Sequence, residues 1–148
     1  MSIAKTISVV AAETLLCAGT VSATPGSGVS SNTLAEGASP DGIAVDNRGT
    51  TAVSVREITI APGGSTGWHY HDGQLLAVVK SGTLTRTLHD CSTEVTSAGA
   101  SFVEPAGQDR PHIGENRGAT PVVLLVTYVL PAGQPPSRDA PKPAACAP

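Results

Sequence analysis

Between residues 53 and 130 the sequence is a succession of short runs rich in Val, Ile, Leu and Thr. Each run has the length of a β-strand and is too short for a typical helix. Glycine-containing turn signals separate the runs, and glycine adopts the positive φ angles of tight turns without strain. This pattern predicts an all-β domain, with pairing between consecutive strands as the simplest topology. The eight runs cover residues 53–60, 68–71, 75–81, 83–89, 93–97, 101–105, 112–116 and 122–130.

The last of these runs, Val122 to Leu130, is apolar at nearly every position. A strand of this kind needs cover on both faces, so we expect it in the middle of a sheet.

Composition divides the 148 residues into four segments. Residues 1–23 carry one lysine and then apolar residues that end in small ones, a pattern typical of a signal peptide; a helical or disordered segment is the alternative. Residues 24–40 are small, polar and aperiodic, which predicts a flexible leader. Residues 41–130 form the predicted barrel, and the proline-rich residues 131–148 predict an extended tail. We therefore expect one folded domain in an exported protein.

The charge distribution narrows the range of partners. The formal net charge is -3, and lysine and arginine form no cluster, which argues against nucleic acid as a partner. The apolar stretch near the N-terminus is too short and too interrupted to span a membrane stably. We expect a small-molecule ligand or substrate, and the assembly state stays open, with a homodimer as one candidate.

Cleavage after residue 23 would leave two cysteines, Cys91 and Cys146. An oxidising compartment allows two such thiols to pair, so we expect a disulfide that pins the tail; two free thiols are the alternative. Neither cysteine lies beside a histidine at the spacing of a metal site, which favours a structural role for both.

Three histidines carry the strongest chemical signal. His69 and His71 stand two residues apart, so on a strand their side chains share one face. Imidazole nitrogen binds Zn, Cu, Fe and Ni, and a third imidazole would complete a site if another strand brought it near. His112 is the candidate for that third position.

The sequence around these histidines resembles the two-part motif of the cupin superfamily, and in particular its small single-domain type-2 group. The first half of that motif is G-x5-H-x-H-x3,4-E-x6-G, and the second is G-x5-P-x-G-x2-H-x3-N. Leu75 occupies the glutamate position of the first half, and two extra residues precede His112 in the second. The matching residues are Gly63, His69, His71, Gly82, Gly99, Pro105, Gly107, His112 and Asn116.

This resemblance implies a cupin-type jelly-roll β-barrel that holds one divalent transition metal on His69, His71 and His112. Zn or Cu is favoured for an exported protein because both stand ahead of Fe and Mn in the usual affinity series; Fe, Mn and Ni remain alternatives. Since the leucine at position 75 leaves the full metal charge in place, we expect the site to favour an anionic molecule.

Four further residues are candidates for the pocket. Gln74 would reach the metal as a fourth ligand only if a bulge at residues 72–73 turned it inward, since a regular strand points it away from the side of Leu75. Arg86 and Glu104 are pocket residues or surface ions, and Tyr128 lines the barrel mouth or packs in the core.

Cupins with three histidines and no carboxylate ligand include thiol dioxygenases and acetylacetone-cleaving dioxygenases. The resemblance therefore makes a metal-dependent dioxygenase the first hypothesis for function. A binding module without chemistry, which captures a small ligand or a metal, is the second. A cupin isomerase or lyase is the third.

Overall fold

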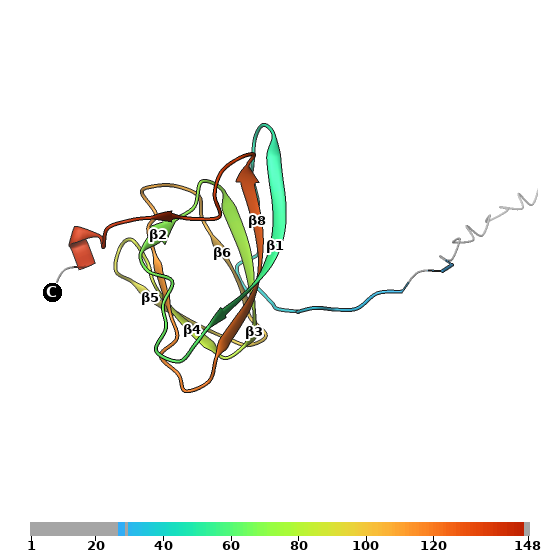
Figure 1. Ribbon diagram of the computed structural model, residues 1–148, viewed down its shortest axis with the longest axis horizontal. Helices are drawn as coiled ribbons and strands as arrows, with labels where there is room; N and C mark the ends of the chain where they lie inside the picture. The colour runs from blue at the N-terminus through green and yellow to red at the C-terminus, as the bar shows by residue number, and fades with distance from the viewer. Residues whose placement is uncertain (1–26, 29, 147–148) are drawn as a thin grey trace, which may run out of the picture. The chain divides into compact units, whose positions relative to one another are not determined.

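A computed structural model describes residues 27, 28 and 30–146, so the predicted signal peptide lies outside the described part. Within that part the chain is built from nine strands and one short 3-10 helix, which confirms the all-β prediction (Figure 1). The elements are β1 (Thr51–Ile60), β2 (His69–Tyr70), β3 (Gln74–Ser81), β4 (Thr83–Thr87), β5 (Thr93–Ser97), β6 (Ser101–Glu104), β7 (Ile113–Glu115), β8 (Val122–Pro131), β9 (Arg138–Asp139) and η1 (Ala144–Cys146).

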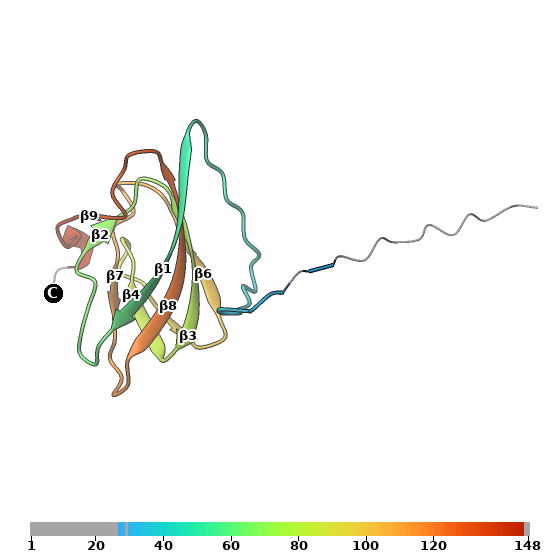
Figure 2. The ribbon, with the colours of Figure 1, turned by 45° about the vertical axis from the view of Figure 1, so that its right-hand side comes forward.

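The strands form two main sheets that face each other and enclose the core, as a jelly-roll does (Figures 1 and 2). One sheet has the order β1-β8-β3-β6 and the other has the order β5-β4-β7, while β2 pairs with β9. All these pairs are antiparallel. The expected pairing of consecutive strands is wrong for all of them except β4 with β5. The chain instead passes between the sheets, which gives each sheet an inner face to bury.

Strand β8 lies between β1 and β3, which confirms its predicted central position. Its side chains alternate between fully buried and half-buried, because the inner face meets the core and the outer face is only partly covered. Five inward residues come from this strand alone, namely Val122, Leu124, Val126, Tyr128 and Leu130. They pack against buried residues of β3, β4 and β6 to form the barrel core.

Glycines let two strands approach closely where the barrel needs it. A Cβ at Gly73 would collide with the Val129 carbonyl oxygen, so only glycine permits β3 to begin against the end of β8 at this point. Gly82 has a positive φ of 78° and joins β3 to β4 in a one-residue turn. These two turns set where the inward residues of β3 begin and end.

Residues on both sides of the predicted 41–130 domain also pair with the barrel. Ala38, in the predicted leader, forms a parallel bridge with Ala100. In the predicted tail, β9 pairs with β2, and the sulfurs of Cys91 and Cys146 lie 2.06 Å apart, at disulfide distance. In the described residues no helix has the length and hydropathy that crossing a bilayer requires.

Candidate metal centre

The three histidines predicted to gather do lie together at one end of the barrel. His69 begins the short strand β2, and His71 follows its last residue, Tyr70. An antiparallel bridge joins His69 to His112. Two backbone hydrogen bonds of 3.0 and 2.9 Å hold that bridge, each from the amide of one histidine to the carbonyl of the other. The ring centroids are 4.5 to 5.2 Å apart. This short bridge brings His112 back to the H-x-H segment.

A carboxylate joins the histidines from a strand that the motif did not indicate. Glu104 ends β6, and the β3–β6 register makes it the direct cross-strand partner of Leu75. Its Oε2 atom lies 3.1 Å from Nε2 of His71 and 3.4 Å from Nε2 of His112. One ligand atom from each of Glu104 and the three histidines lies within 4.8 Å of all the others. The barrel thus supplies a carboxylate one strand away from the motif position.

The histidine rings are oriented by backbone carbonyls. Each Nδ1 atom faces a carbonyl oxygen, at 2.9 Å for His69, 2.7 Å for His71 and 3.1 Å for His112. A carbonyl only accepts hydrogen bonds, so each Nδ1 carries a proton and Nε2 is the nitrogen that faces the cluster. Nε2 of His71 also lies within hydrogen-bond distance of the Glu104 carboxylate, so either a proton or a metal ion has to lie between these two atoms. The carbonyls belong to Gly67, Pro136 and Arg110 respectively.

Three imidazole nitrogens and one carboxylate thus face one another, and such a group fits a cation, either a proton or a metal ion. Nε2 of His112 is fully buried and makes no hydrogen bond, although it faces the Glu104 carboxylate. An unpartnered buried nitrogen aimed at a carboxylate is costly unless a proton or a metal ion lies between them. Three imidazole nitrogens and one carboxylate oxygen suit Zn, Cu, Fe, Mn or Ni, so the residues present fit the predicted divalent transition metal.

The pKa values in the cluster are set by burial and by the contacts between Glu104 and the histidines. Burial by itself raises the pKa of Glu104, but the interactions with His112 and His71 outweigh it and hold the carboxyl well below its usual range. Burial lowers the pKa of His69. Burial acts in the same direction on His112, but its interaction with Glu104 prevails and raises the pKa. Glu104 is therefore an ionised carboxylate that can bind a cation.

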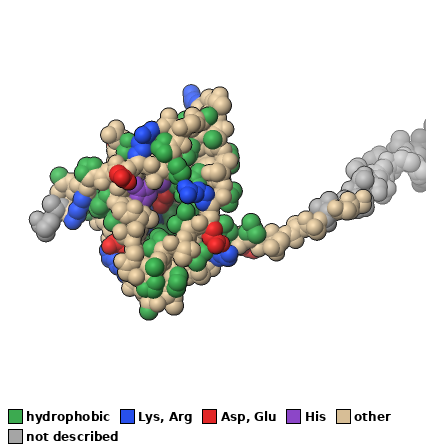
Figure 3. All heavy atoms as spheres, in the orientation of Figure 1, with side chains coloured by type: hydrophobic (Ala, Val, Ile, Leu, Met, Phe, Trp, Pro, Cys, Tyr) green, Lys and Arg blue, Asp and Glu red, His purple; other side chains and the backbone are tan. Residues whose placement is uncertain are grey.

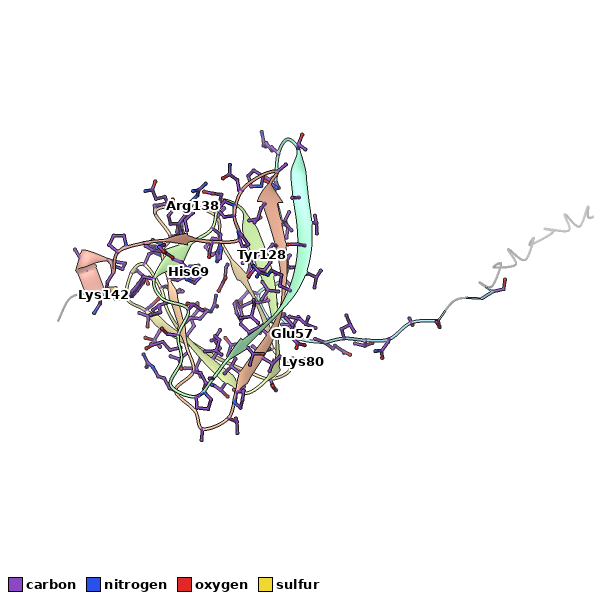
Figure 4. The ribbon with its side chains drawn as sticks, viewed as in Figure 1. Glu57, His69, Lys80, Tyr128, Arg138 and Lys142 are labelled. Carbon is purple, nitrogen blue, oxygen red and sulfur yellow. A yellow bond between two sulfur atoms is a disulfide. The ribbon has the colours of Figure 1, made fainter. Side chains whose placement is uncertain are left out.

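A small cavity of about 50 Å³ adjoins the cluster. His69, His71 and Glu104 line one part of it, while the rest is almost wholly apolar. Leu75 is 1 % exposed and its side chain belongs to the cavity wall. Tyr128, the cross-strand partner of Leu75 on β8, also lines this cavity and is therefore a pocket residue as well as a core residue. Figure 4 shows His69 and Tyr128 pointing into the barrel.

Arg86 and Glu104 were candidates for surface ions, and that alternative is wrong for both. Arg86 is 4 % exposed because it alternates with Leu84 on the inner side of β4. Its guanidinium lies 3.6 Å from the centroid of the Phe102 ring and 3.7 Å from a Glu104 oxygen, and it also pairs with Glu94. Burial lowers the pKa of Arg86, but arginine keeps its charge in proteins. Glu104 thus faces the histidines on one side and a fixed positive charge on the other.

Gln74 does not reach the cluster, so its candidate role as a fourth ligand is wrong. The strand runs without the inward bulge that this role required, and alternation along β3 turns Gln74 to the outer face while Leu75 faces in. Its amide oxygen accepts a hydrogen bond of 2.8 Å from the Asp46 amide, and its amide nitrogen donates one of 3.3 Å to the Ala44 carbonyl. Gln74 therefore anchors the segment that precedes β1.

Sequence reasoning missed two contributors to this end of the barrel. The Pro136 carbonyl, which faces His71, comes from the proline-rich tail, and no sequence signal marks a backbone carbonyl as a partner. Arg56 stands on the inner side of β1 with its guanidinium 5.7 Å from the centroid of the Tyr128 ring. The alternation of Arg56 with Ile58 and Ile60 could have indicated its inward direction. Figure 3 shows histidine and acidic side chains at the open end of the barrel.

Comparison with known proteins agrees with this geometry. The family model described as Cupin domain matches residues 56–128. A chain from crystal structures of DMSP lyases is 26% identical with a TM-score of 0.52, over 60% of this chain and 44% of its own length. The polyketide cyclase RemF from Streptomyces resistomycificus is 25% identical with a TM-score of 0.52, over 64% of each chain.

A sugar phosphate isomerase of a cupin superfamily, from Silicibacter pomeroyi, is 27% identical with a TM-score of 0.46, over 51% of this chain and 48% of its own. This chain therefore spans less than two thirds of the length of these solved structures. No curated protein matches the chain.

Proposed function

The chain carries a cupin-type domain, and we propose that it is a metal-dependent enzyme that acts on a small organic anion. The observation that carries the proposal is the buried cluster of His69, His71, His112 and Glu104, whose Nε2 and carboxylate atoms converge beside a small cavity. This ligand set revises the expectation of histidines alone, since Glu104 supplies the carboxylate that Leu75 lacks. A bound metal would act there as a Lewis acid toward an oxygen of the substrate.

The charges around the cluster support an anionic substrate even with Glu104 as a ligand. Arg86 lies 3.7 Å from Glu104 and offsets its negative charge, so a divalent ion would keep most of its own positive charge. Arg56 adds a second positive charge next to Tyr128, and within the described residues it forms no ion pair. A carboxylate or enolate would meet attraction from both the metal and Arg56.

Tyr128 supplies the group for proton chemistry in the cavity. Burial raises the pKa of its phenol, so the hydroxyl is protonated near neutral pH and can donate a hydrogen bond or a proton to a bound substrate. A Lewis acid on one side and a proton donor on the other suit elimination, isomerisation or cyclisation. The similarity to a DMSP lyase and to a polyketide cyclase favours this redox-neutral class.

A metal-dependent dioxygenase is the second candidate. The cavity supports it, because its small volume of about 50 Å³ and its mostly apolar wall suit a small uncharged molecule such as dioxygen beside the ligand cluster. This candidate requires iron or another redox-active metal, whereas the redox-neutral chemistry works with zinc.

Turnover assays with two metals separate these candidates from a binding module without chemistry. Protein loaded with Zn²⁺ or with Fe²⁺ is incubated with DMSP, thiols, β-diketones and polyphenols, with and without dioxygen, and with Glu57→Gln as a surface control. Turnover by the zinc form without dioxygen supports the redox-neutral enzyme. Consumption of dioxygen by the iron form alone supports the dioxygenase, and tight metal binding without any turnover supports the binding module.

Export remains a proposal, and the cysteines support it. Cys91 and Cys146 lie at disulfide distance, and disulfides persist in oxidising compartments. We propose that residues 1–23 direct export and that the native metal is Zn or Cu, the ions that imidazole sites bind ahead of Fe and Mn. Elemental analysis of protein purified from its native host tests this assignment, and iron at full occupancy would contradict it.

A further inference from the structure

The C-terminal strap, which we define as residues 132–146, lies against the H-x-H segment, which carries two of the candidate metal ligands. We propose that this strap is a working part of the metal centre: the Pro136 carbonyl fixes the ring of His71, and the Arg138–Asp72 ion pair and the Cys91–Cys146 disulfide hold that carbonyl in place. The inference rests on the proposed function, because it concerns the same metal site.

His71 differs from the other two histidines in where its ring partner comes from. His69 and His112 each use a carbonyl two residues earlier in the chain, so local backbone geometry orients their rings. His71 uses the carbonyl of Pro136, which lies 65 residues away in sequence and 2.7 Å away in space. The side chain of His71 is 2 % exposed, so water has little access to replace that acceptor. The orientation of this ring therefore depends on the strap.

Four contacts place the strap along the H-x-H segment. In β9, Asp139 pairs with His69 and Arg138 pairs with Tyr70. The amide of Ala140 donates a hydrogen bond of 2.9 Å to the Trp68 carbonyl. The guanidinium of Arg138 donates one of 2.6 Å to the carboxylate of Asp72, the residue that follows His71. Figure 4 shows Arg138 on the segment that crosses the barrel end beside His69.

The disulfide supplies the far anchor of the strap. Most strap residues are exposed, so they bury little apolar surface, and their prolines form few backbone hydrogen bonds. Cys146 is bonded to Cys91, which sits in the turn between β4 and β5 at a positive φ of 69°. This bond ties the end of the strap to the β5-β4-β7 sheet and keeps Pro136 close to His71.

Release of the strap would change which nitrogen of His71 carries the proton. Without the Pro136 carbonyl, nothing in the described structure holds a proton on Nδ1, whereas the Glu104 carboxylate, 3.1 Å from Nε2, favours the tautomer with a protonated Nε2. That tautomer offers no lone pair to the cluster. Loss of a partner that orients a ligating histidine typically weakens metal affinity by about 10- to 100-fold, and we expect the same range here.

The test uses the full chain and releases both anchors. The variant Cys91→Ser/Cys146→Ser/Arg138→Glu removes the disulfide and turns the Arg138–Asp72 attraction into repulsion. The matched control carries the same cysteine changes with Lys142→Glu, an equal charge change at an exposed strap residue for which no ion pair is seen in the described structure. Addition of Asp72→Arg to the released variant should restore the ion pair with reversed sign.

Two readouts separate ring positioning from general stability. Zn²⁺ affinity is measured by competition with a chelator, and the ring ¹⁵N shifts of His71 report its tautomer in the metal-free protein. We expect about 10- to 100-fold weaker zinc binding and a mixed tautomer in the released variant, near-normal values in the control, and recovery with Asp72→Arg. The core variant Val122→Ala, which lowers stability away from the histidines, should keep both properties.

Unchanged zinc affinity together with an unchanged His71 tautomer in the released variant would overturn the proposal, as would equal losses in the released variant and Val122→Ala. Zinc binding by neither the wild type nor any variant would refute the metal site of the proposed function. The tautomer measurement on metal-free protein still decides the role of the strap in that case, so the two failures are distinguishable.

Discussion

The cross-strand pair of Leu75 and Glu104 allows the ligand assignment to be tested by exchange. The two residues are direct register partners on β3 and β6, and Cβ atoms of such partners lie about 5 Å apart on the same face. The double variant Leu75→Glu/Glu104→Leu moves the carboxylate to the position where the family motif has its glutamate. We expect Glu104→Leu alone to lose most metal affinity and the double variant to regain it.

The size of the effect follows from the linkage between metal binding and unfolding. At a free zinc concentration of about 100 times the wild-type Kd, binding stabilises the fold by about 2.7 kcal/mol. For a domain of this size that gain raises Tm by about 10 °C. If loss of the Glu104 carboxylate raises Kd about 100-fold, the same zinc concentration stabilises the variant by only about 0.4 kcal/mol, or about 2 °C.

Thermal unfolding with and without zinc measures this difference for the wild type, Glu104→Leu, the double variant and Leu75→Glu. The zinc-free Tm of each protein serves as its own baseline, because Glu104→Leu also removes one of the two carboxylates that pair with the buried Arg86. Glu57→Leu, at an exposed glutamate on β1, is the surface control. A zinc-induced shift of about 10 °C in Glu104→Leu would refute Glu104 as a ligand. No recovery in a folded double variant would show that the cluster does not accept a carboxylate from β3.

Three further outcomes are expected. His112→Ala should lose most bound metal while Gln74→Ala retains it, as elemental analysis after dialysis can show; loss of metal in Gln74→Ala would contradict the outward direction of that side chain. Replacing both Cys91 and Cys146 by serine should lower the free energy of unfolding by up to about 4 kcal/mol in chemical denaturation, since the bond closes a 55-residue separation; an unchanged denaturation midpoint would refute this estimate. Arg56→Gln should weaken azide binding to the Co²⁺-loaded protein several-fold in a spectroscopic titration, and unchanged binding would remove Arg56 from anion recognition.

The strands could be predicted from the sequence because each depends on local composition. Every predicted run between residues 53 and 130 contains or overlaps a strand, and the run that is apolar at nearly every position became the central strand β8. The pairing order could not be predicted, because it depends on contacts between segments far apart in the chain. Strand β9 was missed for a related reason: two residues in a proline-rich tail have no strand pattern, and they pair only because the tail passes beside β2.

The histidines of the cluster could be predicted from local sequence, whereas the place of the carboxylate depends on strand pairing. His69 and His71 share a face by local alternation, and the motif spacing pointed to His112. Glu104 could be named as a candidate but not ranked, because its position depends on the register between β3 and β6. Arg86 shows the limit of judging burial by residue type: a charged side chain can lie inside a barrel when two carboxylates and an aromatic ring receive it.

The position of the carboxylate on β6 instead of β3 places its charge near Arg86 and leaves the apolar Leu75 in the cavity wall. The Glu104 carboxylate lies within reach of Arg86, which lines other hollows of the barrel and not the small cavity. At the motif position, Leu75 forms part of that cavity wall, opposite Tyr128 on the neighbouring strand. Glu104 also lines this cavity, but Arg86 offsets its charge, whereas no lysine or arginine among the described residues lines the cavity to offset a glutamate at position 75, which would repel an anion there. For the proposed function, the exchange of positions would let the centre keep a carboxylate ligand whose charge Arg86 offsets, while Leu75 leaves the adjoining cavity wall apolar beside the Tyr128 hydroxyl.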